Sequence, residues 1–389
     1  MCQHEGVTDP QNWLPPTNPE RRAAPYGAYG AAGGAPAAPA GGPAPGWAPP
    51  PKPGLIPLRP LDFGTLLWAP FQVLRRNPKA TFGSALIVQS VITLLTLVVV
   101  GAVTFVALGR IDSASPAERD AVEAGSMAAI VLSALIPVAL AVIASALLQG
   151  VIVVEVARAT LGEKLRLGRL WRAAGRRLWP LVLWAVLLSA AILLGIALVV
   201  GGTMLFVTLG GGWVGLGVAI AILGGMALLA AGAWLSTKTS LVPSLIVLER
   251  LGIGRAVRRS WSLTAGYFWR TLGILLLVAL IVNVIAQIVT TPLAFLFTIA
   301  MSLVDPNAAF EDWIPSIILY VLTLFLTLVV GAVTAVIQSA TTALIYIDLR
   351  MRKEGLDLEL QRFVEAGRSG GVADPYLVAP GAQPGAPWA

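Results

Sequence analysis

The chain contains five stretches with no Asp, Glu, Lys or Arg, and each is at least 30 residues long. Four of them (80–109, 124–154, 271–304 and 313–347) hold 30 to 35 residues, and the remaining one, 178–237, holds 60. A helix needs about 20 apolar residues to cross a hydrocarbon core of roughly 30 Å. Because such runs recur in a chain with only 12% charged residues, they exclude an ordinary water-soluble fold.

The longest charge-free run is interrupted by three consecutive glycines, Gly210, Gly211 and Gly212. Because glycine runs favour turns over helix, this run is predicted to form two spans joined by a tight turn. A transmembrane β-barrel would instead show segments of about ten residues with alternating polarity, and the sequence has none. We therefore predict an all-α polytopic membrane protein over residues 55–362. Its six transmembrane helices are expected at about 80–108, 126–154, 179–208, 213–237, 271–300 and 315–347.

Lysine and arginine are distributed unevenly between the two ends of these spans. Of the 27 basic residues, 21 lie near the spans on the side of the chain termini and four more lie in the distal tails, whereas only Arg110 and Arg119 fall on the opposite side. Positive residues mark the cytoplasmic side, so both termini are predicted to be cytoplasmic. Arginine outnumbers lysine 22 to 5, a bias that indicates a bacterial genome of high GC content and so the plasma membrane. The net charge of +7 follows from this topology, and we expect no nucleic-acid partner.

Both ends of the chain differ in composition from the spans. Fifteen of the 28 prolines lie in the first 60 residues, and 23–54 is almost wholly Ala, Gly and Pro. Such a segment cannot bury enough apolar surface to offset the entropy of ordering it. We therefore predict disordered cytoplasmic tails at 1–54 and 363–389, with 354–365 extending the last helix as a short amphipathic piece. The N-terminal tail is either a simple tether or, through a polyproline II face at 45–54, a docking arm for protein partners.

Three segments on the basic side share one pattern: 61–78, 165–180 and 251–263. Each has an apolar residue three positions before a glycine, followed by apolar residues at helical spacing. A basic amphipathic helix beside a span lies in the membrane interface with its apolar face toward the acyl chains. We therefore predict three helical hairpins repeated in parallel, each preceded by a cytoplasmic interfacial helix. The arginines of these helices are either anchors or candidate contacts for anionic lipid: Arg75, Arg76, Arg169, Arg172, Arg176, Arg177, Arg258 and Arg259.

Each even-numbered span ends on an acidic residue with an arginine close behind it. The three acids are Glu155, Glu249 and Asp348. We expect them to pair with arginines of the interfacial helices and so to link the three repeats. A titrating or gating role is the alternative, because ionisable groups at membrane depth are costly and often functional.

Polar residues inside the spans are few. Asn283 and Gln287 are four apart on the fifth span and therefore share a face. With Gln89, Gln149 and Gln338 on other spans, they either line a small polar site or form hydrogen bonds between helices.

Lys238 is a separate candidate, because it follows the fourth span and precedes a further apolar run, 241–248. Its side chain is expected to extend to the headgroup region. A strongly tilted helix would place it deeper, where it would need an acidic or amide partner.

The sequence carries none of the usual catalytic or cofactor-binding patterns. It has one cysteine (Cys2) and one histidine (His4), which leaves no disulfide and no histidine cluster for a metal within this chain. No nucleotide-binding glycine motif and no pair of carboxylates occur in the spans. We predict no enzymatic activity and no cofactor.

Three segments, 56–83, 248–273 and 345–360, resemble the bacterial membrane-domain family named after glycerophosphoryl diester phosphodiesterase. The middle one reads LERLGIGRAVRRSWSLTAGYFWRTLG, and the resemblance, closest to an uncharacterised actinobacterial-type branch, covers roughly residues 55–360. The family name implies an enzyme only where a catalytic barrel is fused, and this sequence lacks the histidines and clustered acids of such a barrel. The resemblance therefore implies a six-span membrane domain of unassigned function.

These observations favour a non-enzymatic membrane protein that organises lipid or partner proteins at the cytoplasmic face. A transporter that uses the polar residues of the fifth span is the first alternative. An accessory subunit of a lipid-modifying enzyme is the second. The sequence does not indicate an oligomeric state.

Overall fold

The computed structural model describes residues 54–175, 177–304, 310–366 and 374–377. Every regular element within these ranges is a helix. Six helical segments are long and apolar enough to cross a membrane, which confirms the prediction of an all-α protein with six candidate spans. They are Phe82–Ser113, Arg119–Thr160, Leu178–Thr208, Trp213–Leu248, Phe268–Leu303 and Glu311–Glu354.

Two of the six spans are interrupted. The second consists of α3 and α4, and the fourth of α7 and α8, each with a proline in the first turn of its second helix: Pro137 in α4 and Pro243 in α8. Proline has no N–H to donate, so it suits the start of a helix better than its interior. In chain order the span helices are α2 (Phe82–Ser113), α3 (Arg119–Ser133), α4 (Leu135–Thr160), α6 (Leu178–Thr208), α7 (Trp213–Thr239), α8 (Val242–Leu248), α10 (Phe268–Leu303) and α11 (Phe310–Glu354).

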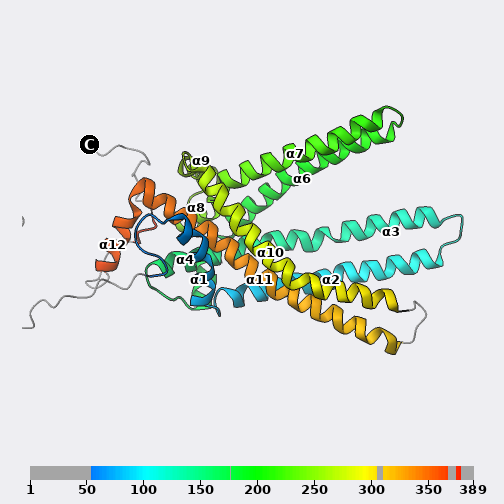
Figure 1. The fold of residues 1–389 in the computed structure, drawn as a ribbon, viewed down its shortest axis with the longest axis horizontal. Helices are drawn as coiled ribbons and strands as arrows, with labels where there is room; N and C mark the ends of the chain where they lie inside the picture. The colour runs from blue at the N-terminus through cyan, green and yellow to red at the C-terminus, as the bar shows by residue number, and fades with distance from the viewer. Residues whose placement is uncertain (1–53, 176, 305–309, 367–373, 378–389) are drawn as a thin grey trace, which may run out of the picture. The chain divides into compact units, whose positions relative to one another are not determined.

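The long helices pack as consecutive pairs. α2 packs against α3, α6 against α7, and α10 against α11 (Figure 1). α4 also packs against α2, α6 and α11, and so connects the pairs. The turn between α6 and α7 contains Gly210 and Gly211, with φ of 68° and 55°. Glycine adopts this conformation without steric cost, and the predicted break of the longest apolar run is confirmed.

Four short helices lie at the end of the spans opposite the turn between α6 and α7; Figure 1 labels three of them, α1, α9 and α12. We call them, together with α8 and the adjoining ends of the spans, the helical base. α11 continues to Glu354, beyond the charge-free run, and Gly355 with φ of 66° separates it from the last short helix. The predicted amphipathic extension is therefore a new helix. The four short helices are α1 (Phe63–Arg76), α5 (Leu167–Gly175), α9 (Ile253–Thr264) and α12 (Leu356–Ala366).

The apolar faces of α1, α5 and α9, which were expected to face acyl chains, are partly buried against the protein and partly exposed. Leu66 on α1 is 1% exposed, and Leu170 on α5 and Ala256 on α9 are completely buried. These helices lie on the ends of α4, α8, α10 and α11, which offer a close-packed surface. Such a surface supplies more dispersion contacts than fluid lipid does.

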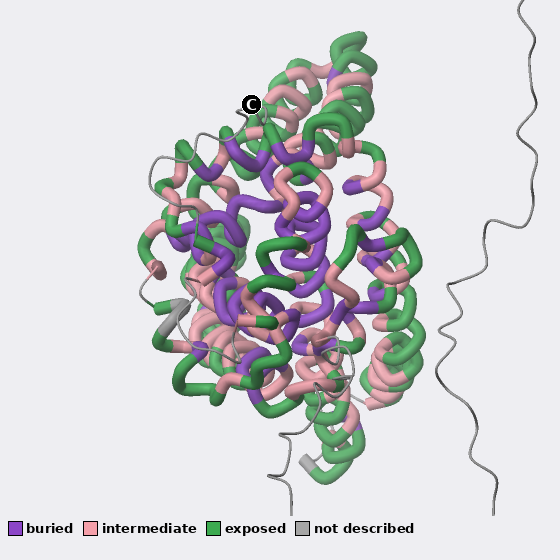
Figure 2. The backbone as a smooth tube through the Cα atoms, turned by 90° about the vertical axis from the view of Figure 1, so that its left-hand side faces the viewer, coloured by how far each residue is buried: buried purple, intermediate pink, exposed green. Residues whose placement is uncertain are grey.

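The buried core is concentrated in the helical base. α4 is buried from Gly150 to Ala157, and α8 from Val242 to Val247. By contrast, α6 buries only Leu181 and Val182, both in its first two turns. Figure 2 shows the buried backbone at the centre, surrounded by exposed helix. The remaining apolar surface of the spans is left for the hydrocarbon of the membrane.

The C-terminal end of the described region departs from the predicted tail. Residues 363–366 belong to α12, and Tyr376 is 2% exposed. At the N-terminal side, Leu55, the first residue of the predicted membrane domain, donates its backbone N–H to the carbonyl of Ala159 at 2.9 Å. Residues 1–53, 367–373 and 378–389, which make up the rest of the predicted tails, lie outside the described residues.

Candidate functional site

A buried ion network lies in the helical base. Glu249, directly after α8, is ion-paired with Arg259 of α9, and their side chains are 0% and 9% exposed. A second guanidinium nitrogen of Arg259 lies 2.9 Å from the carboxylate of Glu354 at the end of α11. One arginine therefore joins the connection after α8 to the last turn of α11.

Two residues of α11 complete this network. Arg350 Nε lies 2.8 Å from Glu354 and 3.7 Å from Glu249. The hydroxyl of Tyr346 donates to Glu249 at 2.9 Å and accepts from Arg350 at 2.9 Å. Two carboxylates thus face two guanidinium groups, which compensates the large cost of removing these charges from water.

The C-terminal segment 374–377 binds beside this network. A guanidinium nitrogen of Arg158 lies 2.5 Å from the carboxylate of Asp374. The hydroxyl of Tyr376 donates to the carbonyl of Ala157 at 3.1 Å and lies 2.5 Å from the hydroxyl of Thr160. Burial raises the pKa of Tyr376 above its usual range, so the phenol stays neutral and can keep donating.

Asp348 joins the start of α1 to the end of α11. Its carboxylate accepts from the backbone N–H of Leu61 at 2.8 Å and from Arg352 at 3.0 Å, and Arg270 lies 3.5 Å away. The carbonyl of Leu61 accepts in turn from Arg270 at 2.7 Å and from Arg352. Asp348 and its arginines therefore satisfy both backbone polar groups of a buried residue.

Glu155 near the end of α4 is 1% exposed and is linked to α1 by an amide. Asn77 donates to Glu155 Oε1 at 2.9 Å and to the carbonyl of Leu165 at 3.3 Å. The other oxygen, Oε2, has no hydrogen-bond partner among the described residues.

Each of the three acids therefore contacts another segment of the base, but only Glu249 pairs with an arginine of an expected interfacial helix, Arg259. Asp348 uses arginines of α10 and α11, and Glu155 uses Asn77. The arginines of α1 and α5 are turned outward, because the opposite faces of these helices are buried in the core. The parallel repeat of the hairpins stays a prediction.

Exposed arginines surround the helical base. They form no ion pair within 4 Å with any acid in the described part of the chain. Arg76 and Arg177 also lack such a pair but are half-buried. Four of them belong to the arginines predicted to contact lipid: Arg75 on α1, Arg169 and Arg172 on α5, and Arg258 on α9.

Two of the arginines predicted to contact lipid are not among these exposed or half-buried residues. Arg259 is buried and engaged by two carboxylates, so it is not available to a lipid headgroup. Its partners compensate its charge more closely than a headgroup at the surface would. Arg176 lies outside the described residues.

Lys238 lies at the end of α7, half-buried. Its ammonium group is 5.6 Å from the centre of the Phe268 ring, a cation–π distance. Its backbone carbonyl accepts a hydrogen bond from the hydroxyl of Ser260 on α9 at 2.6 Å. No acid of the described residues lies within 4 Å of the ammonium group, and its extension to the headgroup region stays a prediction.

Asn283 and Gln287 are exposed on α10. Gln287 accepts a hydrogen bond from Thr291 on the same helix, at 3.3 Å. A mainly apolar cavity of about 360 Å³, with a few amides and hydroxyls in its lining, lies elsewhere, between α4, α6, α7, α10 and α11. Gln149 and Gln338 line it, whereas Asn283 and Gln287 do not. Gln89 on α2 does not line it either, so the five amides considered together from the sequence do not form one site.

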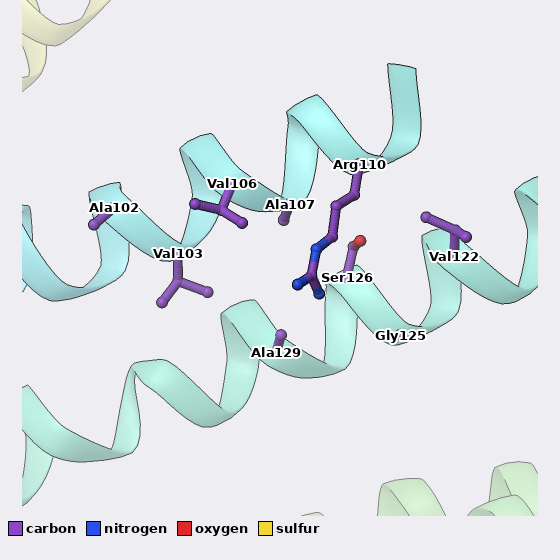
Figure 3. A pocket seen from close by; sticks show the side chains of 9 residues that line it. All are labelled: Ala102, Val103, Val106, Ala107, Arg110, Val122, Gly125, Ser126 and Ala129. Atoms are coloured by element: carbon purple, nitrogen blue, oxygen red, sulfur yellow. The ribbon is translucent and has the colours of Figure 1, made fainter. Parts of the chain in front are cut away.

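A second cavity, of about 480 Å³, lies between α2 and α3 toward their connecting turn. Figure 3 shows the side chain of Arg110 from α2 extending between the two helices toward Ser126 of α3. The rest of the lining consists of small and branched apolar residues. Arg110 is exposed, so this cavity is a surface recess with one cation.

The sequence did not single out four members of the buried networks: Tyr346, Glu354, Asn77 and Tyr376. For two of them a signal exists, because Tyr346, Arg350 and Glu354 are spaced four apart and must share one face of a helix. Tyr376 stands in a stretch rich in Gly, Ala and Pro, where composition favours disorder. Nothing in its local sequence indicates that it is buried.

The site offers no candidate metal centre in the part of the chain that the structure describes, since no group of three His, Cys, Asp or Glu residues lies close enough to hold an ion. The polar features are instead ion pairs, amides and outward arginines. No protein-family model, no curated protein and no solved structure matches the chain.

Proposed function

We propose that the protein is a non-enzymatic plasma-membrane protein whose helical base organises anionic lipid, and through it partner proteins, at the cytoplasmic face. The proposal includes both termini on that side and membership of the membrane-domain family that the sequence resembles. The uneven distribution of arginine and lysine supports this orientation.

The observation that carries the proposal is the set of outward arginines around the helical base. Arg169 and Arg172 on α5 are exposed and have no acidic partner within 4 Å among the described residues, while Leu170 between them is completely buried. The helix is therefore held by the protein core and presents its charges outward. Each arginine near an anionic leaflet contributes about 1 kcal/mol of attraction.

The test compares the thermal unfolding of the full chain in nanodiscs of phosphatidylcholine with and without phosphatidylglycerol. We expect phosphatidylglycerol to stabilise the protein, and we expect Arg169→Gln with Arg172→Gln to remove about 2 kcal/mol of that stabilisation. The matched control is Arg169→Lys with Arg172→Lys, which keeps both charges and should therefore keep the stabilisation. Equal unfolding in both lipid mixtures would refute the proposal.

Transport is the second candidate function, because the cavity of about 360 Å³ places amides and hydroxyls among five span helices. Its lining includes Gln149, Gln338 and Thr341, which could bind a small polar solute. In this second candidate function, polar residues of α4 and α11 bind the solute, whereas the sequence had suggested those of the fifth span. Uptake of such solutes into proteoliposomes, lost in Gln149→Leu with Gln338→Leu, would favour transport over a purely organising role.

A further inference from the structure

A cavity of about 320 Å³ in the helical base is lined by three arginines from three segments. Arg158 is in the last turn of α4, Arg177 immediately precedes α6, and Arg250 follows α8 by two residues. Asp374 is the one carboxylate in the lining. We call this space the arginine cavity. At liquid density it has room for roughly ten water molecules, and its walls carry three positive charges against one negative charge.

Two of the three arginines lack a counter-charge. Arg158 is paired with Asp374 at 2.5 Å and lies 3.8 Å from Glu163. Arg177 and Arg250 have no acid of the described residues within 4 Å. Arg250 also has φ of 56°, a conformation that residues other than glycine rarely adopt. The turn that ends α8, closed by the N–H of Leu251 on the carbonyl of Leu245 at 3.4 Å, therefore places Arg250 at the wall of a cavity with excess positive charge.

The chemistry of this lining selects for an oxyanion. A guanidinium group is planar, always charged and able to donate two parallel hydrogen bonds to phosphate oxygens. Arginines that converge on one space from three segments can reach different oxygens of the same tetrahedral group.

An apolar groove of about 520 Å³ begins on the same two segments. Trp179, Leu183 and Val186 of α6 line one side, and Gly252 and Ile253 line the other. In sequence, Trp179 is two residues beyond Arg177, and Gly252 is two residues beyond Arg250. Trp179 is 80% exposed at the start of a span, the depth at which tryptophan meets headgroups.

We propose that the arginine cavity binds the headgroup phosphate of an anionic phospholipid and that the adjoining groove receives one of its acyl chains. The inference rests on the proposed function and gives it a single defined lipid site. Basic pockets between transmembrane helices bind phospholipid headgroups by this combination of charge and adjoining hydrocarbon. A free phosphate ion would use the arginines and leave the groove without a role.

The experiment measures lipid binding to the full-length protein in a non-ionic detergent, by native mass spectrometry and by titration. Phosphatidylglycerol is expected to bind saturably as one molecule per chain, and phosphatidylcholine about tenfold more weakly because it is zwitterionic. Inorganic phosphate is the third arm, and it should not displace phosphatidylglycerol. Displacement by inorganic phosphate at comparable concentration would overturn the lipid assignment in favour of a soluble anion.

The variant pair is Arg177→Gln with Arg250→Asn, because asparagine tolerates positive φ better than most residues. It should weaken phosphatidylglycerol binding about tenfold. The matched control, Arg110→Gln with Arg119→Gln, removes the same charge from exposed positions at the other end of the spans, and its affinity should stay within about twofold. Equal weakening in both pairs would mean diffuse attraction and would overturn the defined site.

A second variant keeps the inference testable if the first pair does not fold. Asp374→Asn removes the one carboxylate in the lining, so phosphatidylglycerol should bind about threefold more tightly, as expected for a weakened like-charge repulsion. Unchanged or weaker binding would contradict the assignment. This result is separable from the proposed function, because general stabilisation by phosphatidylglycerol in nanodiscs can persist without a saturable site.

Discussion

Two adjacent arginines in α9 have opposite environments. Arg258 is exposed, whereas Arg259 is 9% exposed and lies between Glu249 and Glu354. No local property of the sequence separates them, since both fit the basic face of an amphipathic helix. What separates them is the position of Glu249 and Glu354, which depends on how α8 and α11 pack against α9. At the residue scale, the sequence therefore predicts that acids and arginines meet, and packing decides which ones do.

The first prediction concerns this pair of arginines. Arg259→Ala should lower the free energy of unfolding by about 3 kcal/mol, because it leaves the buried carboxylate of Glu249 and the half-buried one of Glu354 facing a single remaining guanidinium group. Arg258→Ala should change it by less than about 0.5 kcal/mol. Unfolding in mixed micelles with increasing dodecyl sulfate measures both. Similar effects of the two variants would contradict the buried network.

The second prediction concerns the buried phenol in the C-terminal segment. Burial raises the pKa of Tyr376 in the folded protein, whereas the unfolded chain has the ordinary value of about 10. The stabilisation by the neutral phenol is therefore complete below pH ~10 and decreases as the pH rises above that value.

Tyr376→Phe should remove this pH dependence. At neutral pH it should also cost about 1 kcal/mol through loss of the hydroxyl contacts with Thr160 and Ala157. Melting temperatures of the wild type and the variant, measured between neutral and strongly alkaline pH, provide the test. A parallel decline of both proteins above pH ~10 would assign the effect to other groups.

At the scale of elements, the charge-free runs predicted the six spans correctly because hydrocarbon imposes one demand, apolarity over about 20 residues. The faces of the short helices could not be predicted in the same way. An amphipathic helix buries its apolar side equally well against lipid or against protein, and periodicity does not distinguish them. The cavity lined by Gln149 and Gln338 could not be predicted from the sequence either, because it depends on the packing of five helices.

The third prediction tests the packing of α6 against α7. A Cβ atom added at Gly217 would lie 2.9 Å from a methyl of Val207 and 3.1 Å from the carbonyl of Thr203. Gly217→Leu should therefore destabilise the hairpin by about 2 kcal/mol through overpacking. Gly215→Leu is the control, because an added Cβ there meets nothing within 4 Å. Thermal unfolding in detergent should separate the two variants, and equal melting temperatures would argue against this contact.

The fourth prediction concerns topology. A reporter inserted at Gly211, in the turn between α6 and α7, should lie on the opposite side of the membrane from one inserted at Glu163, between α4 and α5. The turn caps two spans that begin and end in the helical base, so one crossing must separate these positions. Fusions to alkaline phosphatase and to a fluorescent protein report the two sides. Reporters at Gly211 and Glu163 found on the same side of the membrane would contradict the six-span arrangement.

At the scale of the whole molecule, the core is placed at one end of the spans. Leu241, Leu245 and Ile246 are completely buried in the base, whereas Leu198, Leu229 and Leu303 are 69%, 76% and 80% exposed in the spans. Composition predicted that the chain lies in a membrane, because this much apolar surface cannot be covered by the protein itself. It could not predict where the close packing lies, since Leu and Val are abundant throughout.

The fifth prediction follows from this exposed surface. The full chain should stay monodisperse in detergent and should aggregate when the detergent is removed, because the exposed apolar surface of the spans has no polar cover. Size-exclusion chromatography with light scattering measures this. A soluble monomer in detergent-free buffer would overturn the membrane assignment.

The one-sided core also has a consequence for how chains of this kind diverge. Positions in the outer parts of the hairpins are surrounded by liquid acyl chains, which require a side chain to be apolar but do not require a particular shape. Positions such as Ile152, Leu245 and Tyr346 are enclosed on every side and therefore require both. Over evolutionary time, substitutions should accumulate freely toward one membrane surface, while the amino acids near the other are retained.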